Sequence, residues 1–320
     1  MMRSAPVTPR PLLFLAPMAG VTNTVFRRLC KGLGADVLTT EFVSAEGILR
    51  RNERTRRYLE FHPEERPLGV QLFGADPDHL AEATRAVIHW VAPDFIDLNF
   101  GCPANKVVCK NGGSSLLRDG PLLAGVAGAV VKAAGSVPVT AKIRIGWDSR
   151  SVNAVEISRI LEASGVQRIA VHGRTKAQGY SGAADWTVIA GVADAVSIPV
   201  IGNGDIGNAR IALQRLQETR VAGLMIGRAA MGRPWIFSEI RQVLDGGPCP
   251  APPTLRRQWE LILLHCAQEI AWWGGRELPA MKAMRARLMT YTRGLPGGSR
   301  LRERLQRVES LDEVREIAGS

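Results

Sequence analysis

The stretch 97–103, with the sequence DLNFGCP, carries one thiol, Cys102, between a glycine and a proline. Glycine permits a positive φ and proline holds φ at about −65°, so the backbone around this thiol has a defined shape. A strand that ends in a loop with a polar residue and a cysteine is typical of the way parallel α/β proteins present reactive groups. Most cysteines outside disulfides are small buried hydrophobic residues. This motif alone therefore leaves both interpretations of Cys102 open.

Polar or small residues stand at the end of nearly every β-like run of the chain. In order they are Pro17-Met18-Ala19, Glu41, Gln71, Asn99 with Cys102, Lys142 with Arg144, His172 with Arg174, Asn203-Gly204-Asp205 and Gly227-Arg228. Taken singly, Gln71 could satisfy a backbone group, Lys142 could pair with a carboxylate and His172 could be a buried core imidazole. In a barrel of parallel strands, however, these ends meet on one face. Their common location favours a functional site.

Two of these ends, in the stretches 201–205 and 223–228, contain glycine at the end of a strand. Small residues let backbone N–H groups approach an anion, and a following helix N-terminus adds partial positive charge. The loops after strands 7 and 8 are the usual phosphate site of a (β/α)8 barrel, and Arg228 can add a charge-assisted contact. We therefore expect a phosphorylated cofactor or substrate, without an indication of which compound.

The elements that must position these residues are eight short apolar runs separated by helical segments. The expected strands are 12–16, 36–40, 68–73, 95–99, 137–143, 168–171, 199–201 and 222–226, and the expected helices are 21–33, 45–59, 77–90, 122–134, 151–163, 185–195, 207–216 and 233–244. This alternation predicts a parallel sheet. Eight such units match a (β/α)8 TIM barrel over residues 1–245. An open, doubly wound sheet is the alternative, but no G-x-G-x-x-G sequence follows the first run.

A segment rich in proline and glycine, residues 245–253, follows the last unit and marks a domain boundary. Beyond it the pattern is helical at 254–273, 279–293, 301–308 and 311–317, with no β-like alternation. We expect residues 254–320 to form a small all-helical domain.

The net charge of the 320-residue chain is +11, which favours a polyanionic partner such as nucleic acid, or an anionic surface, although a basic soluble enzyme is the alternative. Five cysteines without C-x2-C spacing predict neither a disulfide framework nor a zinc site. Thiols outside disulfides suit a reducing cytosol. The first apolar run is too short for a signal peptide and is interrupted by Pro17. No run is long enough to span a bilayer. We expect a cytoplasmic, monomeric protein without metal.

Seven stretches together resemble the bacterial tRNA-dihydrouridine synthases, over nearly the whole chain. They are LAPMAGVTNTVFRRLC, GVQLFGADP, IDLNFGCPANKVVCKNGGSSLL, PVTAKIRIGW, VHGRTKAQGYSG, IPVIGNGDI and LMIGRAAMGRPWIF. The combination is highly specific, whereas a single piece such as the GNGD turn is weak. The C-terminal region resembles subgroup B of this family, more loosely.

The resemblance implies an FMN enzyme that reduces the C5=C6 bond of particular uridines in tRNA. NADPH reduces the flavin, hydride passes to C6 of the uracil, and an acid protonates C5. By motif position, the resemblance implies that Cys102 is the proton donor. It further implies an isoalloxazine lined by Pro17, Met18 and Ala19, flavin contacts from Gln71, Lys142 and His172, a ribityl phosphate held by Asn203, Gly204, Asp205, Gly227 and Arg228, and uracil contacts from Asn99, Arg144 and Tyr180.

The chemistry of these residue types agrees with the implied roles. An ordinary thiol, with a pKa of about 8.5, still holds its proton at pH 7 and can act as an acid. A lysine such as Lys142 can stabilise the negative charge that develops on reduced flavin. The loop 104–115 contains the sequence NGGS, and we expect it to be a lid that carries Cys102 into place.

Residues 276–307 contain nine Lys or Arg residues against two acids, a net charge of +7. Holding RNA requires cations along its backbone, and reaching a base requires flipping it out. The helix in this region has an apolar stripe of Met281, Met284, Leu288 and Tyr291, with Lys282, Arg285 and Arg293 beside it. We expect Lys282 and Arg285 to contact tRNA, although a merely solvated charged face is the alternative. Arg50, Arg51, Arg54, Arg56 and Arg57 form a second basic cluster.

Three other functions share parts of this pattern. A flavin barrel that oxidises or reduces a small molecule, of the dihydroorotate type, explains the flavin site but not the basic helices. An RNA-binding or RNA-folding factor with a vestigial flavin site explains the basic helices. A phosphosugar barrel without flavin explains only the phosphate loops.

Overall fold

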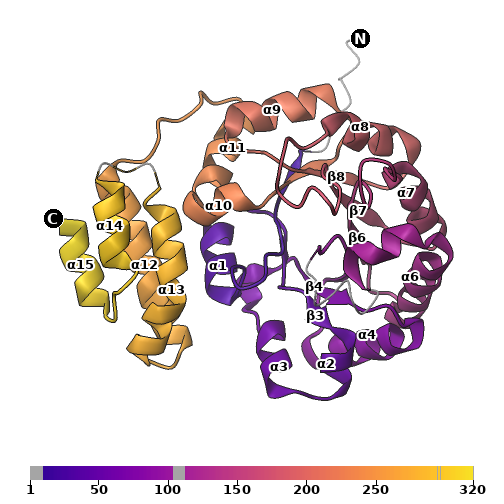
Figure 1. Cartoon of the computed structure of the whole chain (residues 1–320), viewed down its shortest axis with the longest axis horizontal. Helices are drawn as coiled ribbons and strands as arrows, with labels where there is room; N and C mark the ends of the chain where they lie inside the picture. The colour runs from indigo at the N-terminus through magenta and orange to yellow at the C-terminus, as the bar shows by residue number, and fades with distance from the viewer. Residues whose placement is uncertain (1–9, 104–111, 294, 296, 320) are drawn as a thin grey trace, which may run out of the picture.

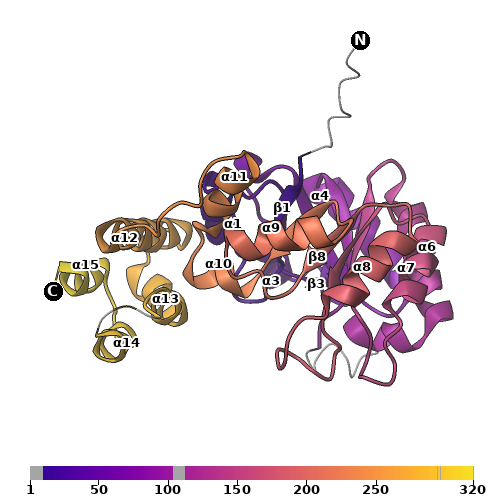
Figure 2. The same cartoon turned by 90° about the horizontal axis from the view of Figure 1, so that it is seen from above.

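A ring of parallel strands lies inside a ring of helices, and four further helices lie beside it (Figure 1). The computed structural model describes residues 10–103, 112–293, 295 and 297–319, apart from the side chain of Arg54. Figure 2 shows the four C-terminal helices at one side of the barrel, next to α1 and α10.

The strands follow one another around the ring in the order β1-β9-β8-β7-β6-β5-β4-β2, and every pair in this path is parallel. Their bounds are β1 Leu12–Leu15, β2 Leu38–Thr39, β4 Leu68–Phe73, β5 Phe95–Phe100, β6 Val139–Arg144, β7 Arg168–His172, β8 Val200–Asn203 and β9 Gly223–Ile226. A parallel bridge between Phe14 and Val37 joins β1 to the segment before β2, and so closes the ring. The predicted TIM barrel is confirmed, and the doubly wound alternative is wrong.

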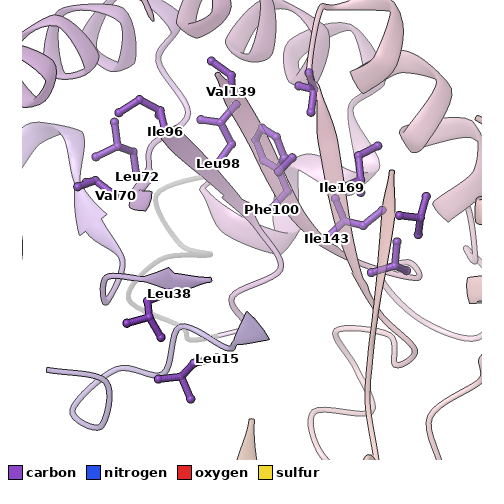
Figure 3. Close-up of a cluster of buried hydrophobic side chains, with 14 of the residues drawn as sticks. Leu15, Leu38, Val70, Leu72, Ile96, Leu98, Phe100, Val139, Ile143 and Ile169 are labelled. Atoms are coloured by element: carbon purple, nitrogen blue, oxygen red, sulfur yellow. The ribbon is translucent and has the colours of Figure 1, made fainter. Parts of the chain in front are cut away.

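Side chains alternate between the two faces of each strand, and this alternation separates the core from the site. On β5, Ile96, Leu98 and Phe100 belong to the cluster that packs between strands and helices, part of which Figure 3 draws. The alternate residue Phe95 belongs to a second cluster that lies inside the ring. Arg168 of β7 stacks there on the rings of Phe14 and Phe95, at 5.0 and 4.7 Å from their centroids. The residues that alternate with the core residues, nearer the carboxyl end of each strand, therefore also face the interior of the barrel.

The barrel helices begin at side-chain caps in several places. Asn23 accepts a hydrogen bond from Phe26 N at the start of α1, and Asp76 accepts one from His79 N at the start of α4. The bounds are α1 Thr24–Gly32, α2 Ala45–Leu49, α3 Glu53–Leu59, α4 Pro77–Val91, α6 Gly120–Ala134, α7 Ala154–Ala163, α8 Trp186–Ala195, α9 Ala209–Glu218, α10 Arg228–Gly232 and α11 Ile236–Leu244, with 3-10 turns η1 Pro63–Glu65 and η2 Gly113–Arg118 and a two-residue strand β3 Val43–Ser44 beside β4.

Two expectations about local structure need correction, and a third is only partly covered by the described residues. The helix expected at 21–33 begins at Thr24, because Val21 N and Thr22 N donate to the carbonyl of Met18 in a turn. The helix expected at 45–59 is two helices, separated where Arg51 has a φ of 50°. Of the expected lid, residues 104–111 lie outside the described residues, and 113–115 begin the buried turn η2.

The all-helical C-terminal region is confirmed. It consists of α12 Leu255–Trp272, α13 Glu277–Tyr291, α14 Gly298–Leu305 and α15 Leu311–Gly319. These helices have a hydrophobic cluster of their own, which includes the whole expected stripe Met281, Met284, Leu288 and Tyr291. The domain boundaries at 245 and 254 stay a prediction.

Buried polar contacts join this bundle to the barrel. Arg287 of α13 donates to the carbonyl of Val21 at 2.5 Å, and its Nη1 lies 3.1 Å from Nε2 of His265. Glu269 of α12 accepts from the side-chain amide of Asn23 at 3.0 Å and from the indole N–H of Trp273 at 3.2 Å. Because Arg287 and Glu269 are buried, separating the two parts would cost them their hydrogen bonds to Val21 and Asn23.

Candidate active site

A chain of hydrogen bonds crosses three neighbouring strands at the inner face of the ring. Thr140 Oγ1 donates to Asp97 Oδ1 at 2.5 Å, and Gln71 Nε2 donates to Asp97 Oδ2 at 2.6 Å. Asn99 Nδ2 donates to Gln71 Oε1 at 2.7 Å. Because Asp97 accepts at both oxygens, it determines which way the Gln71 amide faces, and Gln71 then orients Asn99.

Asn99 in turn holds the turn that carries Cys102. Its Oδ1 accepts from the backbone N–H of Cys102 at 2.8 Å. The carbonyl of Cys102 accepts from Ser114 Oγ at 2.9 Å, and Arg144 Nε donates to the carbonyl of Gly101 at 3.0 Å. The thiol-bearing residue is 9% exposed at the carboxyl end of β5. Side chains from β5 and β6 therefore fix the position of its backbone.

Lys142 places an ammonium group beside this network. The pKa of Lys142 is lowered to about 8, mainly by burial and also by the nearby charge of Arg144, although the charges of Asp97 and Cys102 oppose this shift. Within the part of the chain that the structure describes, the ammonium group of Lys142 makes no hydrogen bond or ion pair. It is therefore available to an acceptor on a bound molecule.

Asp97 keeps its carboxyl group in the interior of the barrel. Burial raises the pKa of Asp97, and the hydrogen bonds from Thr140 and Gln71 and the charges of Arg168 and Lys142 oppose that rise. The hydrogen bonds from Thr140 and Gln71 therefore offset part of the cost of burying this carboxyl group.

His172 lies at the end of β7, two strands from β5. The pKa of His172 is lowered to about 2, mainly by burial and also by the charges of Lys142 and Arg144. The imidazole is therefore neutral at pH 7 and offers one donor and one acceptor nitrogen. Its ring centroid lies 6.3 Å from that of Tyr180.

Arg144 and Tyr180 shape the rim of the site. Arg144 Nη1 donates to the carbonyls of Thr175 and Gly179, at 2.7 and 2.8 Å. Tyr180 is 59% exposed, and its ring lies 5.7 Å from the Arg144 guanidinium and 4.7 Å from that of Arg228. Arg144 thus holds the loop that presents Tyr180.

Asp205 joins the ends of β7, β8 and β9. Its Oδ2 accepts from Arg174 Nη2 at 2.8 Å and from Ala184 N at 2.7 Å, and its Oδ1 accepts from Arg228 Nη2 at 3.0 Å. Burial would raise the pKa of Asp205, but the hydrogen bonds from Arg174 and Ala184 and the charges of both arginines lower it overall. Asp205 therefore orients two guanidinium groups.

Arg174 is a site residue to which the sequence assigned no role. It is nearly fully buried, and its Nη1 has no hydrogen-bond partner among the described residues. Its position two residues after His172 was the only available signal.

Backbone N–H groups gather at the ends of β8 and β9. Those of Gly204, Gly227 and Arg228 make no hydrogen bond within the described part of the chain. Gly204 has a φ of +132°, and a Cβ there would lie 2.6 Å from that of Ala184, so only glycine fits. Asn203 Nδ2 donates to the Met225 carbonyl at 2.7 Å and ties the two ends together. This donor set suits an anion.

The end of β1 completes the ring of site residues. Pro17 and Met18 are half-buried there, and Ala19 is exposed. Thr22 Oγ1 accepts from Met18 N at 3.0 Å and stabilises this turn. A Cβ at Gly227 would lie 3.7 Å from Met18 Sδ, which places the end of β1 beside the end of β9.

Comparison with known proteins decides the family. The model of the dihydrouridine synthase (Dus) family matches residues 14–318. The chain belongs to the dihydrouridine synthase family. It is 42% identical over 311 residues to tRNA-dihydrouridine synthase B of Pseudomonas aeruginosa, covering 97% of this chain and 92% of that protein. It is 38% identical over 323 residues to a probable tRNA-dihydrouridine synthase of Mycobacterium tuberculosis, covering 98% and 82%.

Among solved structures, this dihydrouridine synthase family member resembles 6-hydroxypseudooxynicotine amine oxidase from Pseudomonas geniculata N1. The TM-score is 0.54 at 14% identity, over 78% of this chain and 50% of the other. A likeness at this identity supports the barrel fold and nothing more specific.

The two expected RNA contacts of this dihydrouridine synthase family member differ in their surroundings. Lys282 is exposed on α13. Arg285 donates to the carbonyls of Val308 and Arg307, both at 3.0 Å. It therefore provides hydrogen-bond donors for the backbone of the segment after α14. In the second basic cluster, the side chains of Arg50, Arg51, Arg56 and Arg57 are exposed. The side chain of Arg54 is not among those that the structure describes.

Within residues 10–103 and 112–319, as far as they are described, no three His, Cys, Asp or Glu side chains are grouped to hold a metal ion. No helix in this part of the chain has the length and apolar character that crossing a membrane requires.

Proposed function

We propose that this protein is a tRNA-dihydrouridine synthase that uses FMN and NADPH to reduce the C5=C6 bond of uridines in tRNA. The observation that carries the proposal is the position of Cys102 at the same end of the barrel as Lys142, His172 and the anion-binding donors. The names of the relatives support tRNA as the substrate. In the test, purified protein with FMN, NADPH and unmodified tRNA yields dihydrouridine, which mass spectrometry detects as the gain of two hydrogens.

The residues present fit FMN. The unpaired N–H groups of Gly204, Gly227 and Arg228, with the Arg228 guanidinium, suit its phosphate. Asn203 and Asp205 would position these donors. Lys142 and the remaining amide hydrogen of Gln71 would meet the polar edge of the ring system, and Pro17, Met18 and Ala19 would line its apolar side. When bound and reduced by NADPH, FMN supplies the hydride for C6 of the uracil.

The chain's own residues supply the proton and the positioning. Cys102 donates a proton to C5 as a positioned general acid. Neutral His172 can hydrogen-bond to a uracil carbonyl without placing a second charge beside Lys142. The exposed ring of Tyr180 offers a face on which an extruded base stacks, and Asn99 and Arg144 hold the loops on either side.

Replacing Lys142 by methionine should lower the midpoint potential of the bound flavin by about 40 mV, equivalent to about 2 kcal/mol. Below its pKa of about 8 the ammonium is charged and stabilises negative charge on the reduced ring. The difference between wild type and variant should shrink as the pH is raised above this pKa. Redox titration of the flavin measures it. The exposed Lys132 on α6 provides the control variant Lys132→Met, and equal potentials for Lys142→Met and wild type would contradict the contact.

The exposed cations between residues 276 and 307 of the bundle are the proposed tRNA surface. They are Arg276, Lys282, Arg293, Arg300, Arg304 and Arg307. In Figure 2, α13 and α14 lie on the lower side of the molecule, where the loops after β7 also extend. One RNA can therefore contact this surface and the barrel opening together.

Reversing the charges of Lys282 and Arg293 together, to glutamate, should weaken tRNA binding uniformly across tRNA sequences. It should also reduce the salt dependence of the affinity, since each lost phosphate contact removes about 0.7–0.9 from the slope. Filter binding at several salt concentrations measures both effects, with Arg210→Glu on α9 as the control. Arg285 is left unchanged because its hydrogen bonds hold the fold. Loss of FMN in the double variant would indicate damage to the fold instead.

A further inference from the structure

A cavity of about 340 Å³ lies between the barrel and the helical bundle, outside the active site described above. The side chains that define it are Glu41, Arg57, Tyr58, Trp272, Trp273 and Arg287. Its size falls in the range of small-ligand sites. Gly20, which directly follows Ala19, also lines it. Gly20 follows β1 and Glu41 follows β2, so the cavity opens at the same end of the barrel as Cys102.

One wall of the cavity consists of flat groups. The guanidinium carbon of Arg57 lies 5.4 Å from the ring centroid of Trp272 and 5.5 Å from that of Trp273. The two indoles meet edge to face, with centroids 5.9 Å apart. Tyr58 is 38% exposed, and Arg57 is exposed as well. A planar molecule entering from solvent can therefore stack on these groups.

The inner part of the cavity is polar and already ordered. Glu41 is 6% exposed and its Oε2 accepts from Gly20 N at 2.7 Å. Arg287 is held by the Val21 carbonyl, and Trp273 by Glu269. A carboxylate and a guanidinium thus lie beside the stacking wall, where the edge of a heterocycle needs hydrogen-bond partners.

We propose that this cavity binds a second nucleobase of the RNA substrate, flanking the uridine that is reduced. The inference rests on the proposed function. Extruding a uridine from folded RNA removes the stacking partner of its neighbours. Proteins bind such unstacked bases on aromatic rings and arginine planes. The cavity combines both types of plane between the catalytic end of the barrel and the basic bundle. A free anion would use the guanidinium groups but leave the indole faces uncontacted.

The first test measures the affinity of the FMN-loaded enzyme for an unmodified tRNA transcript. Because stacking on one side chain is worth about 1–3 kcal/mol, Trp272→Leu and Arg57→Ala should each raise the Kd by about 5- to 150-fold. Trp272→Phe should restore most of the affinity. The matched controls are Trp90→Leu and Arg85→Ala, at exposed positions on α4, and they should leave the Kd unchanged. Arg57 is exposed, so its variant tests the proposal even if the Trp272 variant unfolds.

The second test changes the RNA. Transcripts carry an abasic nucleotide on the 5′ or the 3′ side of the uridine that the wild-type enzyme reduces. For one of the two sides, the abasic nucleotide should weaken wild-type binding as much as Trp272→Leu does, and should cause no further loss in that variant. Additive losses on both sides, or variants that bind tRNA like wild type, would overturn the second-base site alone. Failure of wild type to bind tRNA or form dihydrouridine would instead overturn the proposed function.

Discussion

Replacing Cys102 by alanine should slow dihydrouridine formation by about 10²- to 10⁴-fold, the range that a positioned general acid contributes. The substitution removes the proton donor but leaves the turn in place, because Asn99 and Ser114 bind the backbone of residue 102 rather than its side chain. The FMN content and the rate of flavin reduction by NADPH should stay at wild-type levels. Single-turnover reduction of tRNA by enzyme with prereduced flavin isolates the affected step.

Two further cysteine variants separate the acid from a general effect of thiol loss. Cys249→Ala, at an exposed position of the segment between barrel and bundle, should react like wild type. Cys102→Ser keeps the size of the side chain but replaces the thiol by a much weaker acid, so it should remain close to the alanine variant. A Cys102→Ala enzyme that reduces tRNA as fast as wild type would remove Cys102 from the mechanism.

Replacing Arg27 by methionine should lower the free energy of unfolding by about 3–5 kcal/mol. Arg27 Nε lies 2.5 Å from Glu65 Oε2, and both side chains are fully buried between α1 and η1. The other guanidinium nitrogens donate to the carbonyls of Thr22 and Glu60, at 2.7 and 2.8 Å. Without Arg27, the carboxylate of Glu65 would stay buried with no opposite charge. Urea denaturation followed by circular dichroism measures the loss.

The neighbouring residue provides the matched control. Arg28 pairs with Glu64 at 3.1 Å, and both side chains are accessible to solvent. Arg28→Met should therefore cost less than about 1 kcal/mol. Removing both buried charges, in Arg27→Met with Glu65→Leu, should recover much of the stability, since no unpaired charge remains. Equal destabilisation by Arg27→Met and Arg28→Met would show that the buried pair has no special energetic role.

Much of the barrel could be predicted because strands buried on both faces appear as short apolar runs between helices. All eight expected strands agree with the structure to within two residues at each end. The run at 36–40 is the least complete match, because only Leu38–Thr39 is a strand. There the chain needs a bridge from Phe14 to Val37 to close the ring, and Arg51 then divides the helix that follows. Neither the bridge nor the break in the helix can be recognised from the hydrophobic periodicity of the sequence.

The candidate site was predictable as a set of residues but not as a set of contacts. Strand ends and motifs pointed to Cys102, Lys142 and His172, while Arg174 received no role. Asn99 and Arg144 were expected beside the uracil, yet the structure also uses them to hold the backbone of two loops. The backbone groups that Asn99 and Arg144 bind lie 3 and 35 residues away in the sequence, respectively, and only the folded chain brings each pair together.

By itself, the sequence determined the closed parallel barrel, the helical region after residue 253 and the family. Apolar periodicity, the proline- and glycine-rich segment and the motifs are all local properties of the sequence. Only the tertiary structure decided that Asp205 orients both Arg174 and Arg228, that burial brings the pKa of Lys142 to about 8, and that a cavity forms between α3, α12 and α13. These properties depend on distances and solvent exclusion between segments far apart in the chain, which local sequence patterns do not show.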